Sequence, residues 1–165
     1  MENDFSMQNN HNKYDAFLTI GAIASQLNLA VQTIRMYEEQ GLILPSRTPT
    51  GRRMYSLKDL EKLRCIRRAI TEEGLNISGI KKLLALIPCW EFMGGLDEDC
   101  LNCQAYIQAM GPCWSSRDVG DKCKKVDCRG CEVYQMNFSC NDLKDLLVRN
   151  KNNKNNNIPK GADDL

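Results

Sequence analysis

Several features that are common in other protein classes are missing from this chain of 165 residues. No run of apolar residues approaches the length of a membrane span, and the amino terminus has no signal-peptide core. Both absences predict a cytoplasmic protein with no membrane partner. Histidine occurs once, as His11, within the polar and Asn-rich residues 1–16. We expect this segment to be disordered, which makes His11 a tail residue rather than a ligand.

The sequence also lacks a β-α-β pattern, which bears on the meaning of its nine cysteines. Thiol-disulfide enzymes normally place a C-x-x-C motif at a helix N-terminus within an α/β fold, where the pKa of the thiol is lowered. Without that fold, such an enzyme is the least favoured interpretation, and we predict a protein that is not an enzyme and has no catalytic residues. In a reducing compartment, the cysteines indicate metal ligands or redox thiols before disulfides.

The net charge of +1 hides an asymmetry between two parts of the chain. Residues 17–87 carry eleven Lys or Arg against six Asp or Glu, whereas residues 88–140 carry five against eight. A basic segment favours a polyanionic partner, and an acidic segment is repelled by it. We therefore expect the two parts to do different jobs.

The basic part contains the run TIRMYEEQGLILPSRTPTGRRMY, from Thr33 to Tyr55. It predicts a short helix that brings Arg35 and Tyr37 near one face and ends at Gly41 in a left-handed turn. An extended segment and a tight reversal at Thr50-Gly51 follow, which predict a basic hairpin. Such a helix can lie in the DNA major groove while the hairpin contacts the phosphates beside it.

Apolar residues at helical spacing predict three further helices in residues 17–87. The first begins at Thr19 and ends at Asn28, a residue type that tolerates a left-handed conformation, and it forms a helix-turn-helix with the helix that follows. The other two lie between Ser56 and Pro88 and are expected to hold the first pair rigid. The predicted fold is mainly α, a winged helix-turn-helix of four short helices with a small β-hairpin wing, followed by a small cysteine-rich module held by metal.

Several motifs spread through this segment carry a family resemblance: Ile20-Gly21, Ala24, Thr33-Ile34-Arg35-Met36-Tyr37-Glu38, Gly41-Leu42, Pro45, Arg47, Gly51-Arg52-Arg53, Tyr55 and Leu60. Through them, residues 18–87 resemble the winged-helix DNA-binding domain of the MerR family of bacterial transcription regulators, and within it the heat-shock repressor branch, HspR. The resemblance implies DNA contacts by residues of the second helix and the wing: Arg35, Tyr37, Arg47, Arg52, Arg53 and Tyr55. Gln32 is a further candidate to face the groove.

The sequence departs from the MerR pattern at two positions. Ala30 stands where the family usually has a Ser or Thr that caps the recognition helix, which costs about 1 kcal/mol of local stability. MerR regulators usually dimerise through a long helix after the DNA-binding domain, and Pro88 interrupts the chain where that helix would run. We still expect a homodimer that reads a near-palindromic site on double-stranded DNA, with RNA polymerase as a further candidate partner.

An internal repeat follows, and each copy consists of P-C-W, a polar loop and C-x-x-C-x-x-Y. The first copy runs from Pro88 to Tyr106 and the second from Pro112 to Tyr134. The repeat resembles the two-CW cysteine module that is appended to bacterial signalling proteins, a resemblance that implies no biochemical role. We expect the tryptophans and tyrosines of the two copies to form the miniature core of this module.

The module is poor in aliphatic residues, so packing alone cannot offset the entropy that the chain loses on folding. It therefore needs a further constraint, such as a bound metal ion. Thiolates at C-x-x-C spacing bind zinc or iron readily, because the two-residue gap lets both sulfurs approach one ion. Eight cysteines are candidate ligands: Cys89, Cys100, Cys103, Cys113, Cys123, Cys128, Cys131 and Cys140. Two tetrathiolate zinc sites and one iron–sulfur cluster with spare thiols both stay open, with zinc slightly favoured.

The sequence thus predicts four parts: a disordered segment over 1–16, the DNA-binding domain over 17–87, the duplicated module over 88–140, and a short helix with a disordered tail over 141–165. The predicted function is that of a sequence-specific DNA-binding transcriptional regulator with a metal-binding or redox-sensing module. The alternative is a metal-dependent protein-interaction module in which the helix-turn-helix is secondary.

Overall fold

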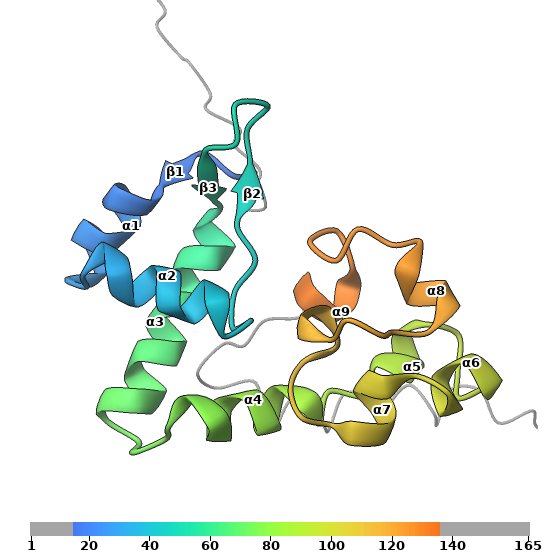
Figure 1. Cartoon of the computed structure of the whole chain (residues 1–165). Coiled ribbons are helices and arrows are strands. Elements are labelled where there is room, and N and C mark those ends of the chain that lie inside the picture. Colours follow the sequence, from blue (N-terminus) through green and yellow to red (C-terminus); the bar gives the residue numbers. More distant parts are fainter. Residues whose placement is uncertain (1–14, 136–165) are drawn as a thin grey trace, which may run out of the picture.

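The computed structural model describes residues 15–135. The first half of this range is a helical unit with a small sheet, and the predicted mainly α, winged helix-turn-helix fold is confirmed (Figure 1). Its elements are β1 Leu18–Thr19, α1 Ile20–Leu27, α2 Val31–Glu39, β2 Ser46–Arg47, β3 Arg53–Tyr55, α3 Leu57–Thr71 and α4 Ile77–Ala85.

Local side-chain chemistry fixes where α1 and α2 begin and end. The Thr19 hydroxyl accepts a hydrogen bond from the backbone N–H of Ala22 at 3.2 Å, which satisfies one free donor of the first turn of α1. Asn28 ends α1 in the left-handed conformation, with φ 49°. Ala30 precedes α2 and makes no side-chain cap. These features agree with the expectations from the sequence.

Helices α3 and α4, which pack against the first two helices, are also capped by side chains at their N-termini. Ser56 and Asp59 form a capping box, in which the Ser56 hydroxyl accepts from the Asp59 N–H at 3.1 Å and Asp59 Oδ2 accepts from the Ser56 N–H at 2.8 Å. The Asn76 side chain accepts from the Gly79 N–H at 2.7 Å and starts α4. Helix α4 ends at Ala85, and Pro88 precedes the next helix, so no long helix follows α4 within the described residues.

The sheet contains one more strand than the predicted hairpin. Strand β3 lies between β1 and β2 and is antiparallel to both, with Leu18 opposite Tyr55 and Ser46 opposite Met54. The hairpin reverses where the Gly51 N–H donates to the Thr48 carbonyl at 2.8 Å. The extra strand ties the base of the wing to the start of α1.

One hydrophobic core connects these elements. It contains fully buried side chains from α1, α2, α3 and α4, together with residues of the loop after α2 and of β3: Ile23, Ile34, Ile43, Tyr55, Leu63, Ile66 and Ile80. The core packs α3 and α4 against α1 and α2, as the sequence pattern predicted, and it also includes Tyr55 of the wing strand β3.

The cysteine-rich half consists of short helices joined by loops, and it lies beside the first unit at the far end of α4 (Figure 1). Its elements are α5 Cys89–Phe92, α6 Glu98–Leu101, α7 Gln104–Gln108, the 3-10 helix η1 Cys113–Ser115, α8 Asp121–Lys124 and α9 Glu132–Gln135. The two copies of the repeat contact each other through α5 and α9. The Asp99 carboxylate of the first copy also accepts hydrogen bonds from the N–H groups of Asp121 and Lys122, at 2.6 and 3.0 Å.

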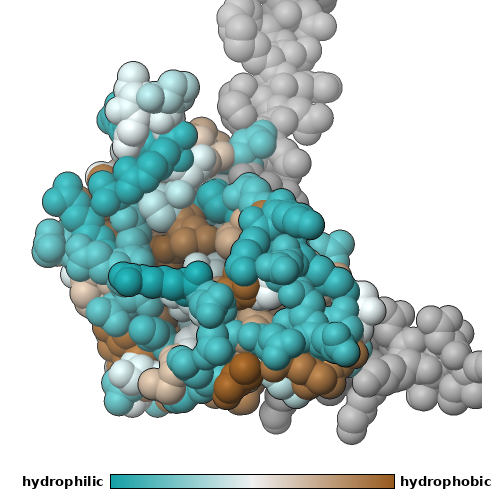
Figure 2. Space-filling view, turned by 45° about the vertical axis from the view of Figure 1, so that its right-hand side comes forward, coloured by the Kyte–Doolittle hydropathy of each residue, from teal (hydrophilic) through white to brown (hydrophobic). Residues whose placement is uncertain are grey.

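Few aliphatic side chains of this half are buried. Leu96, Leu101 and Ile107 are each at least half exposed, whereas Val133 is 2% exposed and belongs to the core of the first half. Figure 2 shows apolar side chains in a hollow between polar surfaces and along the lower edge of the molecule. The cysteine-rich half therefore packs on the core of the first half. None of the helices in residues 15–135 is both long and apolar enough to cross a bilayer.

Candidate nucleic-acid interface and cysteine module

Exposed basic and polar side chains gather on α2 and the wing. Gln32 and Arg35 are exposed on α2, and Arg47 and Arg52 are exposed on the wing hairpin. Among residues 15–135, these four predicted contacts are therefore accessible to a ligand. The Arg47 guanidinium donates to the Gly51 carbonyl at 3.2 Å, which holds it along the hairpin.

Helix and wing meet around one hollow. The side of this hollow formed by α2 contains Arg35, and the wing side contains Arg52 and Arg53. Thr19, Ile20 and Gly21, at the start of α1, complete its wall. The hollow thus combines three arginines with the N-terminal end of a helix, and both favour an anion such as a phosphate.

Tyr37 does not share the exposed face of Arg35, contrary to the expectation from the sequence. Residues two apart in an α-helix point to nearly opposite sides, so a solvent-facing Arg35 places Tyr37 toward the core. Tyr37 is 4% exposed and packs in the hydrophobic core, where burial raises the pKa of its hydroxyl. The burial of Tyr37 supports a packing role, and its direct contact with DNA stays a prediction.

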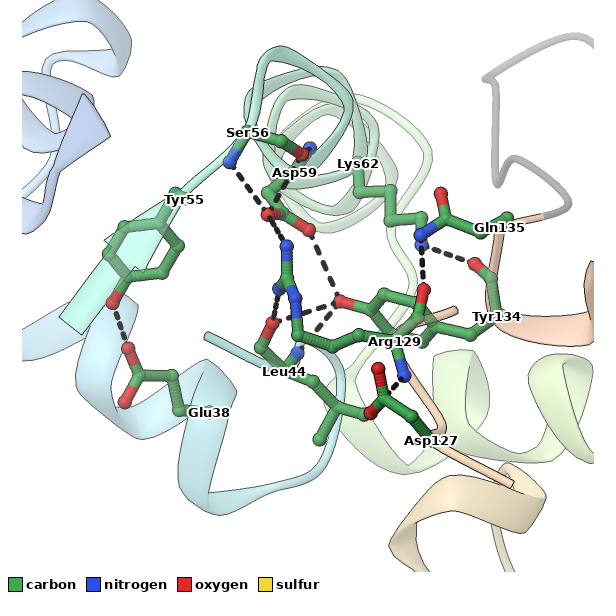
Figure 3. Close-up of polar contacts among 10 residues, drawn as sticks. All are labelled: Glu38, Leu44, Tyr55, Ser56, Asp59, Lys62, Asp127, Arg129, Tyr134 and Gln135. Atoms are coloured by element: carbon green, nitrogen blue, oxygen red, sulfur yellow. Dashed lines mark hydrogen bonds and ion pairs between the residues drawn. The ribbon is translucent and has the colours of Figure 1, made fainter. Parts of the chain in front are cut away.

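Tyr55 and Arg53 hold the wing against α2 through Glu38. Arg53 Nε donates to Glu38 Oε2 at 2.7 Å. The Tyr55 hydroxyl donates to Glu38 Oε1 (Figure 3). Tyr55 is completely buried, and burial raises the pKa of its hydroxyl, with a further rise from the Glu38 contact. Burial likewise supports a packing role for Tyr55, and its direct contact with DNA stays a prediction. Arg53 is half-exposed, and its charge is partly neutralised by Glu38.

The seven candidate ligands within the described residues are free thiols, and Cys140 lies outside those residues. Four cysteines of the second copy, Cys113, Cys123, Cys128 and Cys131, line one largely apolar hollow. Within residues 15–135, no group of three or more His, Cys, Asp or Glu side chains is close enough to hold a metal ion. The thiol donor set suits a thiophilic ion, but its sulfurs surround a hollow and do not converge on one point.

Thiols of both copies influence one another. Burial raises the pKa of Cys113 to about 12 and that of Cys123 to about 11. The next contribution in both cases comes from Cys89, which belongs to the first copy. The two copies therefore bring their cysteines to a shared region, a relationship that their separation in the sequence did not reveal.

A buried polar network joins the second copy to the first half of the chain (Figure 3). Arg129 forms an ion pair with Asp59, with Nη2 3.0 Å from Oδ2, and its Nη1 donates to the carbonyl of Leu44. The Tyr134 hydroxyl accepts from the Leu44 N–H at 2.9 Å and lies 3.2 Å from Asp59 Oδ1. A capping residue of α3 thus also serves as the anchor for the cysteine module.

Lys62 completes this network. Its Nζ donates to the carbonyl of Tyr134 and lies 3.4 Å from the centroid of the Tyr134 ring. Burial lowers the pKa of Lys62 to about 8, while nearby Asp59 acts in the opposite direction. Sequence reasoning did not single out Asp59, Lys62 or Arg129 as a connected set. The sequence held one signal for this set. Arg129 occupies the place in the second C-x-x-C that Leu101 occupies in the first, and this difference between the two copies marks Arg129 as a residue with its own partner.

Comparison with known proteins agrees with this geometry in the first half of the chain. The family described as MerR HTH family regulatory protein matches residues 18–87. Residues 18–87 are a MerR-family helix-turn-helix domain. The match ends just before the first P-C-W motif, so it does not extend to the cysteine module.

Individual relatives resemble the same MerR domain. The heat shock protein HspR of Streptomyces coelicolor is 41% identical over 66 residues, which are 39% of this chain and 44% of the relative. The transcriptional regulator GlnR of Bacillus anthracis is 39% identical over 67 residues, 41% of this chain and 51% of the relative. The mercuric resistance operon regulatory protein of Bacillus cereus is 41% identical over 69 residues, 41% of this chain and 52% of the relative. The chain thus spans about half the length of the curated relatives it matches.

Proposed function

We propose that the protein is a sequence-specific DNA-binding transcriptional regulator. The observation that carries this proposal is the hollow in which Arg35 of the recognition helix faces Arg52 and Arg53 of the wing. A helix and a wing that each bring arginines to one space can engage a major groove occupied by α2 and the phosphates beside it. The relatives named as an HTH-type transcriptional regulator and as an operon regulatory protein support the same function.

The contacts divide into two classes. Gln32 and Arg35 are exposed on α2 and read base edges, while Arg47 and Arg52 neutralise phosphates. Arg53 and Tyr55 act indirectly, because both hold the wing to α2 through Glu38. A homodimer on a near-palindromic site presents two such surfaces, and RNA polymerase is a candidate partner of the bound dimer.

Selection of bound duplexes from a random library tests this function. We expect enrichment of a near-palindromic site, with affinity that falls as salt rises. Arg35→Ala should weaken binding to the selected duplex by about 1–3 kcal/mol and should affect binding to random duplexes much less. Arg117→Ala removes the same charge from an exposed position of the cysteine module and should leave the affinity unchanged. Failure of the wild-type chain to bind any duplex would refute the proposal.

The cysteine module supports a second proposed activity, the binding of a thiophilic metal ion or the sensing of oxidants. Support comes from the four free thiols around one hollow and from the scarcity of buried aliphatic side chains in the module. Zinc is the favoured ion and an iron–sulfur cluster the alternative. Because the sulfurs do not converge, loading would draw together the short helices and turns that carry Cys113, Cys123, Cys128 and Cys131.

Purification without oxygen, followed by metal analysis, thiol counting and a visible spectrum, tests this activity. Zinc gives a colourless protein with a stoichiometric metal content, and an iron–sulfur cluster gives a brown one. Metal-free protein whose thiols also resist oxidation would exclude both versions. A protein-interaction module remains the rival, and it predicts that Arg35→Ala and Arg52→Ala leave all partner binding intact.

A further inference from the structure

The loop from Gly41 to Leu44 connects the recognition helix α2 to the first strand of the wing, and the second cysteine copy holds it. The Trp114 indole N–H donates to the Gly41 carbonyl at 2.9 Å. At the other end of the loop, the Leu44 N–H donates to the Tyr134 hydroxyl at 2.9 Å. The Leu44 carbonyl accepts from Arg129. Three backbone groups of this loop are therefore satisfied by side chains some 70 to 90 residues later in the chain.

The two rings that make these contacts form a rigid pair. Trp114 and Tyr134 meet edge to face, with centroids 5.2 Å apart and planes at 89°. Tyr134 is 1% exposed, so its ring is fixed by its surroundings. The loop approaches the pair so closely that a Cβ added to Gly41 would lie 2.5 Å from Ser115 Cβ. The contact is thus close and well packed.

The first cysteine copy provides an internal comparison. Trp90 and Tyr106 occupy the same places in the repeat and form the same arrangement, with centroids 5.4 Å apart and planes at 87°. Both of these side chains are only half-buried. Among the described residues, no hydrogen bond joins the polar end of either ring to residues 18–87. The duplication thus supplies one aromatic pair that holds the loop and one that does not.

We propose that the second cysteine copy is a positioning clamp for the DNA-reading surface, in which Trp114 and Tyr134 fix the loop between recognition helix and wing. This inference rests on the proposed DNA-binding function and adds a residue set outside the MerR domain to it. By fixing both ends of the loop, the clamp sets how Arg35 of the helix and Arg52 of the wing are placed relative to each other. The clamp residues touch no DNA and act only through the loop.

The clamp also connects the cysteines to that surface. Trp114 and Tyr134 line the hollow that contains Cys113, Cys123, Cys128 and Cys131, so the rings have the thiols on one side and the loop on the other. A change in this hollow that moves either ring also changes the hydrogen bonds at Gly41 or Leu44. The equivalent change at the first pair leaves the loop untouched.

Four conservative variants of the full chain test the clamp. Trp114→Phe and Tyr134→Phe keep an aromatic ring and remove the polar atom that holds the loop, and Trp90→Phe and Tyr106→Phe are their matched controls. Two measurements are made on each: amide hydrogen exchange over residues 41–47 and over α1, and affinity for the selected duplex. If these side chains only stabilise the whole fold, the variants should speed amide exchange in both segments. If they position the loop, exchange should speed up in residues 41–47 alone.

We expect Trp114→Phe and Tyr134→Phe to speed exchange at the Leu44 amide about tenfold and to weaken duplex binding about fivefold or more, as loss of one buried hydrogen bond implies. In both controls, the exchange rate and the duplex affinity should stay within about twofold of wild type, which is less than the effect of losing one buried hydrogen bond. Equal affinity of all four variants would overturn the clamp while leaving the DNA-binding function intact. A wild-type chain that binds no duplex would overturn the function, and the clamp with it. If Tyr134→Phe does not fold, Trp114→Phe decides, since its indole is only part-buried.

Discussion

Arg53 of the wing and Glu38 of the recognition helix form an ion pair, with 2.7 Å between Nε and Oε2. Glu38 is nearly buried, with 8% of its side chain exposed, and its second oxygen accepts from the Tyr55 hydroxyl. One carboxylate on α2 therefore fixes two residues of β3. It also neutralises one positive charge on the surface that we propose for DNA, so a substitution of Glu38 changes both the charge of that surface and the position of the wing.

Glu38→Gln should release the wing and free the charge of Arg53. We expect tighter binding to random duplexes with a salt dependence steeper by about 0.9 in the slope of log K against log salt, as one additional phosphate contact predicts. Discrimination in favour of the selected duplex should fall, because the wing is no longer held. Glu39→Gln makes the same charge change at an exposed neighbouring position and serves as the control. Identical salt slopes for the two variants would contradict the role of the ion pair.

Gly41→Ala should destabilise the chain more than the similar change at Gly74. Both glycines have a left-handed backbone, with φ +72° and +70°, so alanine pays a similar conformational cost of about 1–2 kcal/mol at each. Only at Gly41 would the new Cβ meet Ser115, whereas nothing lies within 4 Å at Gly74. Urea unfolding should show a larger loss for Gly41→Ala. Equal losses would mean that η1 moves away without cost.

Removal of the Arg129 side chain should be costly, because it leaves Asp59 buried without its cation. The Asp59 side chain is 2% exposed in the ion pair. We expect Arg129→Ala to reduce the free energy of unfolding by about 3–5 kcal/mol, since one partner of a buried pair is lost. Replacement of both, in Asp59→Asn with Arg129→Met, should recover part of the loss. A measured cost below about 1 kcal/mol, typical of an exposed pair, would show that water reaches Asp59.

The lowered pKa of Lys62 gives a pH dependence with a defined sign. The ordinary pKa is 10.5 and the folded value is about 8, so the unfolded chain binds more protons between these two values. Folding stability due to this group therefore rises with pH from about 8 to about 10.5. Compared with Lys62→Met, which cannot titrate there, the wild type should gain about 2 kcal/mol between pH 7 and pH 9.5. Urea unfolding of both proteins at the two pH values checks this. If the difference in unfolding free energy between wild type and Lys62→Met were the same at both pH values, the lowered pKa of Lys62 would be refuted.

Removal of bound metal should act first on the cysteine module. If the module holds zinc, a chelator should increase hydrogen exchange in residues 113–135 and weaken the proposed dimer. Cys128→Ser should lower the metal content of protein purified without oxygen, whereas Ser116→Ala, a change at another residue of the same hollow, should leave it unchanged. Unchanged metal content in Cys128→Ser would remove this cysteine from the ligand set. An unaltered dimer after chelation would exclude a metal-dependent interface.

Local chemistry made much of the fold predictable. Thr19, Ser56 and Asn76 cap helices through atoms only three residues away, and such contacts can be read from the sequence. Hydrophobic spacing likewise predicted the four helices that support the wing. Strand β1 was not predicted, because two residues carry no periodic signal and the strand exists only through its pairing with β3.

The candidate site was predictable to a smaller extent. The positions of Arg35, Arg47 and Arg52 follow from helix and hairpin patterns, but the expected common face of Arg35 and Tyr37 was wrong because the helical period separates them. The contacts of Trp114 and Tyr134 with the loop were missed. They depend on how the second copy packs on the first half, and no local pattern encodes an approach between residues so far apart in the chain.

The burial of Val133 in the core of the first half has a consequence for how such proteins arise. To dock in the same way on another regulator, this second copy would need a matching cavity for Val133, a counterpart of Asp59 and a loop like that after α2. The reverse also applies: a chain cut after Ile87 would expose to water the surface that Val133 covers. The domain over residues 18–87 and the cysteine repeat are thus expected to be inherited as one unit and to change together.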